Sequence, residues 1–396
     1  MSWRCWLGDT VTGLVDRPID IPSFSWSVDV GDCALSTNND KGAGTDDWSG
    51  ITVPWTAIME DDPAARASAL CPSRRFLALC WDDGSDLGSP VLWGAVGSRT
   101  DTWLDTSFSL DSMKAMLSKR LLVDEGAYGT GPGGTSPSTI KLTGLSLRAI
   151  ACEIIRRCTS AKPGGALPLD LPYLGEAGGH QREYAAYDVQ NNACSDLIEN
   201  IANVIGGPDM QFRPYKPDES HIRLRFEAGS DGDVYIGQDN IHTLTFFPGG
   251  GTLQDISIDH CGPVMRVYSS GSGTDAAQIC HLAYDPTLVT MPDPWPLVEE
   301  AQSDSDTDSL DVLARHGEAA LASNCRPLMQ ISGKIDFSDP RVPKPGSIWP
   351  GDMVDLAIDG FPTLPDGVHR CRLMQMSGDQ STTATLKFDV MDDPIY

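Results

Sequence analysis

The chain has 396 residues and a mass of 42.6 kDa, too long for one ordinary core, so two or three domains are expected. Hydrophobic residues make up 40% of it, which excludes wholesale disorder. The formal net charge is −26, because 55 acidic residues outnumber 29 basic ones. Tight binding to a nucleic-acid backbone needs clustered Lys and Arg, and this sequence has no such cluster.

Turn-forming residues are abundant. The 39 Gly and 28 Pro favour short elements joined by turns, and 44 of the 55 acids are Asp, which prefers turns and caps to helix interiors. The sequence therefore predicts a β-rich protein whose acidity lies mostly in loops. Without a signal-peptide pattern or a run of about 18 apolar residues, neither export by that route nor a membrane span is expected. The 11 Cys lack a CxxC pair, which is typical of buried thiols in a reducing compartment.

Residues 1–125 alternate short apolar runs with Asp- and Gly-rich turns, a pattern typical of successive antiparallel strands. The predicted strands are Phe24–Val28, Ile51–Trp55, Arg74–Trp81 and Val91–Val96. Helical spacing of apolar residues predicts a short helix within Asp111–Leu121. Residues 126–142 follow, rich in Gly, Pro and Ser, and predict a linker.

An α+β insertion domain is expected over residues 143–235. Apolar residues at i, i+3, i+4, i+7, i+8 and i+11 predict a helix over Leu147–Cys158, with Ser146 as its cap. A second helix is expected after an Asn191–Asn192 cap, and a strand over His221–Phe226 follows it.

Residues 236–396 return to strand patterns and predict a second β-domain with one helix, at residues 309–323. The predicted strands are Leu253–Ile258, Val264–Tyr268, Met353–Ile358, Arg370–Met376 and Thr385–Val390. The predicted fold class is thus mainly β with an α+β middle region, in which two β-domains of barrel or sandwich type flank a helix-containing insertion.

Two motifs resemble ligand sites, and for each the sequence favours a structural explanation. Residues 129–134 match GxGxxG, but no strand precedes them and no helix follows, so a turn-rich linker is favoured over a phosphate site. Asp304, Asp306 and Asp308 mimic the start of a calcium loop, yet its sixth and twelfth positions are Ser and Arg. Capping of the following helix by Asp308 or Ser309 is favoured instead.

The doublets His260–Cys261 and Cys280–His281 are a third candidate, since a zinc site would need ligands from both. Adjacent strand residues point to opposite faces, so each doublet supplies at most one ligand, and structural packing is favoured. The sequence has no GxSxG elbow and no local cysteine-nucleophile signature, although a Cys and His pair assembled in space stays open. No catalytic, cofactor or metal site is predicted.

Tryptophan is concentrated in the first predicted domain, at Trp3, Trp6, Trp26, Trp48, Trp55, Trp81, Trp93 and Trp103. Stacking on sugars is one use of such residues. Burial in cores and interfaces is the favoured interpretation.

Short segments in a fixed order run along nearly the whole chain. They are Trp3–Gly13 with Ile21–Val28, Arg75–Leu79 with Val91–Val96, Ser118–Val123, Asn192–Leu197 with Gly206–Phe212, and Gly351–Leu356. In this order they resemble the minor tail proteins of long-tailed phages of actinobacteria. The resemblance implies a tail-tip or baseplate hub, similar in fold to the hub proteins of contractile tails and to the N-terminal hub region of tail-associated lysins.

The resemblance further implies a homotrimer in which each chain supplies two tube-type β-barrel domains, residues 1–125 and 236–396. Three chains would then form a pseudo-sixfold ring between the tail tube and the tip. Expected partners are the distal tail protein, the tape measure protein and other minor tail or tip proteins, with DNA only passing through the lumen. The expected location is the tail tip of a virion assembled in the host cytoplasm, and no enzymatic activity is expected.

The acidity has a role in this interpretation, because carboxylates lining the lumen would repel DNA phosphates. Three alternatives stay open. They are a hexameric distal tail protein, a host cell-wall hydrolase, and a receptor-binding module that holds surface sugars with its tryptophans.

Overall fold

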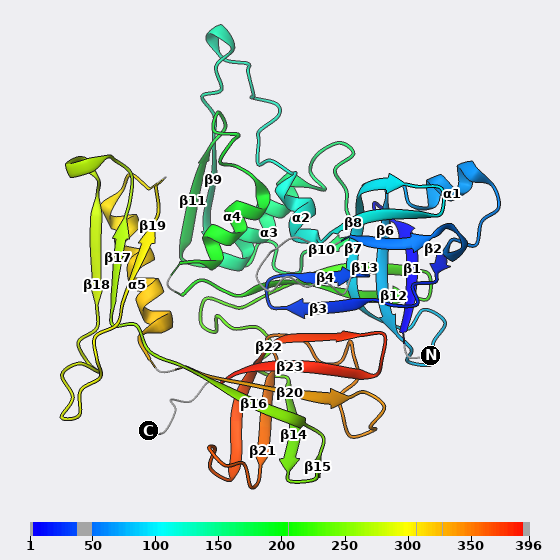
Figure 1. Ribbon diagram of the computed structural model, residues 1–396. Helices are drawn as coiled ribbons and strands as arrows, with labels where there is room; N and C mark the ends of the chain where they lie inside the picture. Colours follow the sequence, from blue (N-terminus) through cyan, green and yellow to red (C-terminus); the bar gives the residue numbers. More distant parts are fainter. Residues whose placement is uncertain (1–2, 38–49, 205, 306, 327, 391–396) are drawn as a thin grey trace.

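The computed structural model describes residues 3–37, 50–204, 206–305, 307–326 and 328–390. The chain is mainly β, and two β units flank a helix-containing middle region, which confirms the predicted fold class. In Figure 1 the N-terminal sheet lies at the right, the C-terminal sheet below it and the middle region above. A further unit, coloured yellow, stands apart at the left.

An antiparallel sheet of six strands forms the N-terminal unit, in the order β2-β1-β6-β7-β8-β5. Its elements are β1 Trp3–Asp9, β2 Val15–Ile19, β5 Ile51–Pro54, η1 Trp55–Ala57, α1 Pro63–Ala69, β6 Arg75–Trp81, β7 Ser89–Asp101, β8 Asp105–Asp111 and α2 Met113–Ser118. Strand β6 is buried on both faces: Leu77 and Leu79 belong to one core, whereas Phe76, Ala78 and Cys80 belong to another. This double burial explains why its sequence is continuously apolar instead of alternating.

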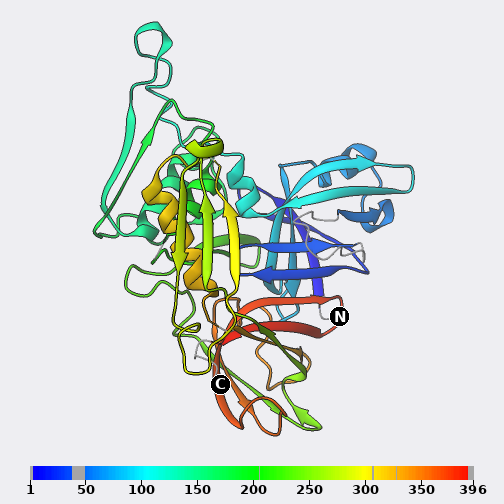
Figure 2. The same cartoon turned by 60° about the vertical axis from the view of Figure 1, so that its left-hand side comes forward.

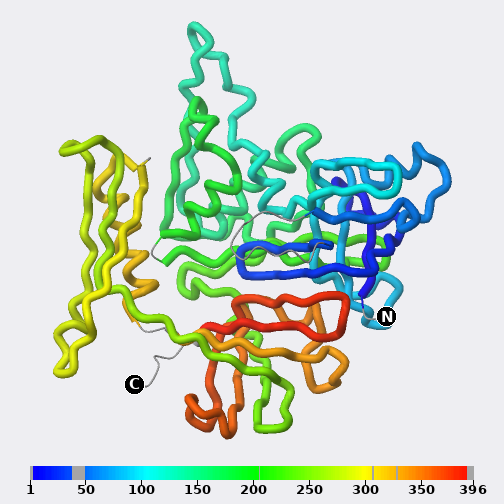
Figure 3. Tube along the Cα trace, in the orientation of Figure 1, coloured from blue at the N-terminus to red at the C-terminus, as the bar shows by residue number. Residues whose placement is uncertain are grey.

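The C-terminal unit is built on a nine-stranded sheet that includes a hairpin from the N-terminal part of the chain. Its own strands are β14 Ile241–Phe247, β15 Gly250–Gly251, β16 Gln254–Cys261, β20 Leu328–Asp336, β21 Met353–Ile358, β22 Gly367–Asp379 and β23 Thr383–Val390. The hairpin consists of β3 Ser25–Asp29 and β4 Cys33–Ser36, and β3 runs antiparallel to the second half of β22. The tube in Figure 3 shows this blue hairpin beside the red strands, so the two ends of the sequence share one sheet.

A single apolar core joins the two β units. The Trp3 ring centroid lies 5.1 Å from that of Trp26 and 4.9 Å from that of Trp81. Phe337 of the C-terminal unit packs on Trp81 at 5.3 Å, and Trp3 Nε1 donates to the carbonyl oxygen of Ser381 at 2.8 Å. Aromatic packing and a hydrogen bond therefore cross the same seam as the shared strand pairing.

The middle region combines a two-stranded sheet, a three-stranded sheet and two helices. Its elements are η2 Pro132–Gly134, β9 Thr139–Leu145, α3 Leu147–Cys158, β10 Leu169–Asp170, β11 His180–Ala185, α4 Cys194–Ala202, β12 Met210–Asp218 and β13 His221–Ala228. Buried faces of α3 and α4 share a second core with Phe76 and Trp93 of the N-terminal sheet. The N-terminal sheet is therefore packed on both sides.

The predicted helices form, but their caps differ. Helix α3 has the predicted bounds, and Ser146 Oγ accepts from the Ala149 amide at 3.2 Å as expected. The predicted cap of α4 is wrong, because Asn192 Nδ2 instead donates to the carbonyl oxygens of Leu122 and Ala185, at 3.3 and 2.9 Å. Asn192 thus ties the start of α4 to the segment that leaves the N-terminal unit.

The lateral unit, which is the described part of residues 264–325, is inserted between β16 and β20. Its sheet has the order β18-β17-β19, and its elements are β17 Arg266–Ser270, η3 Asp275–Ala277, β18 Cys280–Tyr284, β19 Glu299–Ser303 and α5 Leu310–Asn324. Helix α5 packs on one face through a small cluster of Val267, Ala283 and Leu321. Ser309 occupies the N-cap position of α5, but its side chain makes no cap hydrogen bond to the described backbone, contrary to the capping prediction. Figure 2 brings this sheet to the front of the molecule.

Candidate assembly site

Three side chains at alternate positions, on and just before the start of β12, connect the middle region to both β units: Asp209, Gln211 and Arg213. Residues two apart on a strand point to the same face. Gln211 Nε2 donates to the carbonyl oxygen of Asp29 in the β3 hairpin at 2.8 Å. Arg213 Nη2 lies 3.5 Å from Oδ1 of Asp352, in the turn before β21. One edge of β12 therefore fixes the positions of both β units.

Asp352 is fully buried and is the centre of this junction. Its Oδ2 accepts from Asn240 Nδ2 at 2.8 Å and from the Trp349 amide at 2.9 Å, while Oδ1 faces Arg213. Gly237, with a φ of +76°, allows the close approach, since a Cβ there would lie 2.5 Å from Asp352 Oδ1. A buried carboxylate with these partners holds the turn, the start of β14 and the middle region together.

A second buried ion pair lies beside the first. Arg372 of β22 is 5% exposed, pairs with the Asp209 carboxylate, and stacks on the Tyr235 ring with its guanidinium carbon 4.6 Å from the centroid. Burial raises the pKa of Asp209, and the Arg372 charge opposes that shift. Burial likewise lowers the pKa of Arg213, and Asp352 opposes it. Each charge is therefore tolerated because its partner is present, which makes the junction sensitive to the loss of either one.

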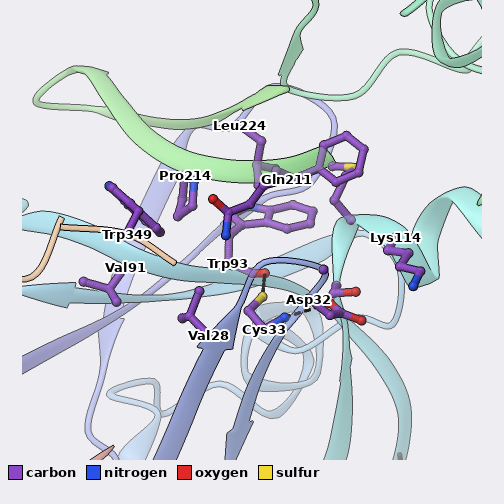
Figure 4. A pocket seen from close by; sticks show the side chains of 14 residues that line it. Val28, Asp32, Cys33, Val91, Trp93, Lys114, Gln211, Pro214, Leu224 and Trp349 are labelled. Carbon is purple, nitrogen blue, oxygen red and sulfur yellow. Dashed lines mark hydrogen bonds between the residues drawn. The ribbon is translucent and has the colours of Figure 1, made fainter. Parts of the chain in front are cut away.

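A cavity of about 20 Å³ lies where the three parts of the chain meet. Figure 4 shows its lining converging from different elements: Val28 from β3, Trp93 from β7, Gln211 from β12, and Trp349 from the C-terminal unit. Trp93 Nε1 is buried and has no hydrogen-bond partner among the described residues. The space accommodates one water molecule and no substrate.

The glycine-rich segment 129–134 lies in a loop that projects from the middle region (Figure 1). The Gly131 amide donates to the Thr135 carbonyl oxygen at 2.9 Å, which closes a turn. The next regular element after η2 in the described chain is strand β9, which begins at Thr139. The segment lacks the strand before it and the α-helix after it that a phosphate-binding loop requires.

The other predicted motifs are dispersed. Asp304 Oδ2 lies 2.5 Å from His316 Nδ1 of α5, while Asp306 lies outside the described residues. His260–Cys261 is on β16 and Cys280–His281 is on β18, in two different sheets. Among the residues that the structure describes, no three His, Cys, Asp or Glu side chains are grouped to hold a metal ion.

The tryptophans of the first predicted domain are mostly core residues. Trp3, Trp26, Trp81 and Trp93 are buried, Trp6 and Trp55 are half-buried, and Trp48 lies outside the described residues. Trp103 is the exception: it is 94% exposed in the turn between β7 and β8. The core interpretation therefore holds for four of them and fails for Trp103.

The cysteines are free thiols throughout the described chain. Burial raises the pKa of Cys5 and of Cys152 to about 12, which makes these thiols poor nucleophiles. In the described segments no helix combines the length and apolarity needed to cross a bilayer.

Sequence reasoning missed the buried charges of the junction. Asp and Arg usually lie at the surface, so one sequence does not reveal that Asp352 and Arg372 are buried. The available signals were the segments Gly206–Phe212 and Gly351–Leu356, which carry the family resemblance and contain Asp209 and Asp352.

No protein-family model matches the chain, and no curated protein matches its sequence. Solved structures do. The 43 kDa tail protein of prophage MuSo2 from Shewanella oneidensis matches with a TM-score of 0.50 and 9% identity, over 98% of this chain and 98% of that one. A tail protein from Neisseria meningitidis matches with a TM-score of 0.48 and 12% identity, over 99% and 97% of the two chains. Prophage tail protein gp18 from Listeria monocytogenes matches with a TM-score of 0.42 and 11% identity, over 99% and 95%. The Shewanella match shows a shared fold over the length of both chains.

Proposed function

We propose that this chain is a structural component of a phage tail tip, a trimeric hub that joins the tail tube to the tip and forms part of the DNA-conducting channel. The observation that carries the proposal is the β3–β4 hairpin of the N-terminal part, which completes the C-terminal sheet. A closed ring needs subunits that present two edges at a constant angle. Shared strands and a shared core supply that constancy.

The full-length fold similarity to the Shewanella prophage tail protein supports the same proposal. So does the chemistry of the junction, where Asp209, Arg213, Asp352 and Arg372 satisfy one another instead of facing a substrate-sized cavity. Buried charges paired in this way favour one arrangement of the parts, which is the property that an assembly component needs.

In this proposal residues 1–125 and 236–396 are the two tube-type domains, 126–142 the linker and 143–235 the insertion domain. The distal tail protein, the tape measure protein and other tip proteins are its partners in the virion. The net charge of −26 suits a channel wall, because an acidic lumen would let the DNA duplex pass without adhering.

Native mass spectrometry of the assembled protein, with averaged electron micrographs of the same sample, tests the proposal. Three 42.6 kDa chains in a ring with a central opening are expected. Six chains would identify a distal tail protein instead. A monomer that clears host peptidoglycan in a zymogram, or that binds surface glycans saturably, would replace the hub by one of the other two alternatives.

A further inference from the structure

The lateral unit leaves one face of its sheet uncovered. On this side Tyr268 of β17 and Leu282 and Tyr284 of β18 are 44, 47 and 41% exposed, and the strand register places Tyr268 opposite Leu282. Helix α5 packs on the other side, where Val267 and Ala283 are buried. We call the uncovered side the tyrosine face. Adjacent large apolar side chains of this kind mark interaction surfaces, whereas scattered ones do not.

The charged groups on the strands of the tyrosine face neutralise each other. Arg266 Nη1 lies 3.2 Å from Glu299 Oε1, which also accepts from the Tyr268 hydroxyl at 3.1 Å. The Arg266 guanidinium carbon lies 4.5 Å from the centroid of the Tyr284 ring. The face thus carries no net formal charge, on a chain whose net charge is −26.

This neutrality distinguishes between possible partners. A partner attracted by the field of so acidic a chain would be basic and would bind where the acids are exposed. A second copy of the same acidic chain is repelled at those surfaces. It meets no like charge at a face whose Arg and Glu are already paired.

The lateral unit is also short of core. A three-stranded sheet with one helix buries apolar surface on one side only, and here the buried cluster centres on three residues. A second layer would bury the remaining aromatic surface. Five-residue strands span about 17 Å, and three strands about 10 Å across, so the tyrosine face covers part of the 2,000 Å² or more that permanent interfaces typically bury. It would be one contact among several in a ring.

We propose that the tyrosine face binds a second copy of this chain, so that the lateral unit of one subunit packs against the body of its neighbour. The inference rests on the proposed homotrimer. A ring of three cannot be closed by two-fold contacts, so the face meets a different surface of the neighbour and not another tyrosine face.

Sedimentation velocity of the full-length chain over a dilution series tests this contact. Leu282→Lys places a charge in the centre of the face, and we expect the concentration of half-dissociation to rise about tenfold or more. Val312→Lys is the matched control: Val312 is 40% exposed on α5 in the same unit, away from the tyrosine face. This control should assemble like the unchanged chain.

Cys280 provides a measurement that needs no substitution. It is exposed on β18, two residues from Leu282, and therefore points to the same face. Modification by N-ethylmaleimide, followed by mass spectrometry, should be slower at Cys280 in the assembled than in the dilute protein. Exposed Cys261 on β16, outside the lateral unit, serves as the internal reference.

The outcomes separate the two proposals. If the chain forms trimers that Leu282→Lys does not weaken, and Cys280 stays equally reactive, the tyrosine face is not the contact and the hub proposal stands. If the unchanged chain is monomeric at every concentration, both proposals are overturned.

Discussion

The junction of the β units and the lateral unit hold their sheets in opposite ways. At the junction, a sheet is packed on both faces, a strand is shared between units, and buried ion pairs cross the seam. In the lateral unit, one face rests on a helix through a small apolar cluster and the other is exposed. The comparison teaches that the body is rigid as a monomer, whereas the lateral unit depends on whatever covers it.

The largest expected effect tests the rigid side of this comparison. Asp352→Ala removes the acceptor of Asn240 and of the Trp349 amide, and leaves Arg213 buried without its counter-charge. We expect the free energy of unfolding to fall by about 3–5 kcal/mol, as when one partner of a buried pair is lost. Urea denaturation followed by tryptophan fluorescence measures it.

Asp355→Ala is the matched control on the same strand. Asp355 pairs with Arg370 at 2.8 and 3.0 Å, but the Arg370 side chain is half-exposed. Exposed pairs of this kind contribute up to about 1 kcal/mol. Equal losses for the two variants would contradict the special role assigned to the buried junction.

A smaller and local effect is expected in the lateral unit. Val267→Ala removes a fully buried side chain from a three-residue cluster, at a cost on the order of 1–2 kcal/mol. Because this unit has few contacts with the body, its amides should exchange with deuterium faster while those of β6 and β22 stay unchanged. Slower or unchanged exchange in α5, or faster exchange throughout the body, would show that the unit is coupled to the frame.

Helix caps give the next contrast, at about 1 kcal/mol. Ser146→Ala removes the hydrogen bond to the Ala149 amide and should lower the free energy of unfolding by about that amount. Ser309→Ala should change it by a few tenths at most, because the Ser309 side chain makes no cap bond to the described backbone of α5. Thermal melts followed by circular dichroism distinguish the two, and similar losses would contradict the difference in capping.

These caps also show how far the sequence predicts the fold. Local patterns sufficed for α3 and for the strand Met353–Ile358, since each depends on its own periodicity and turn residues. Asn192 has the chemistry of a cap, yet the carbonyl oxygen of Leu122, 70 positions earlier, takes its hydrogen bond. A competing long-range acceptor leaves no trace in the local pattern.

The candidate site was less predictable for the same reason. The pairing of β3 with β22 joins residues about 350 positions apart, and the buried state of Asp352 follows only from that assembly. The tyrosine face escaped prediction because Tyr268, Leu282 and Tyr284 alternate like any half-buried strand. Periodicity shows that a face is apolar, but it does not show whether the rest of the chain covers that face.

The smallest expected effect concerns pH and an ion pair within the body. Glu176 accepts from Arg148 Nε at 2.6 Å and from Nη2 at 2.8 Å, and these hydrogen bonds hold the pKa of Glu176 below its ordinary value of 4.5. A carboxyl group with a lowered folded-state pKa stabilises the fold above its unfolded pKa and loses that contribution as the pH falls through the folded one. The difference in unfolding free energy between the unchanged chain and Glu176→Gln should therefore be steady from pH 7 to about 5, at less than about 1 kcal/mol since the pair is partly exposed. It should shrink below pH 4.5, and urea denaturation at a series of pH values measures it. A difference that stayed constant down to pH 3 would show that Glu176 acts through its shape and not through its charge.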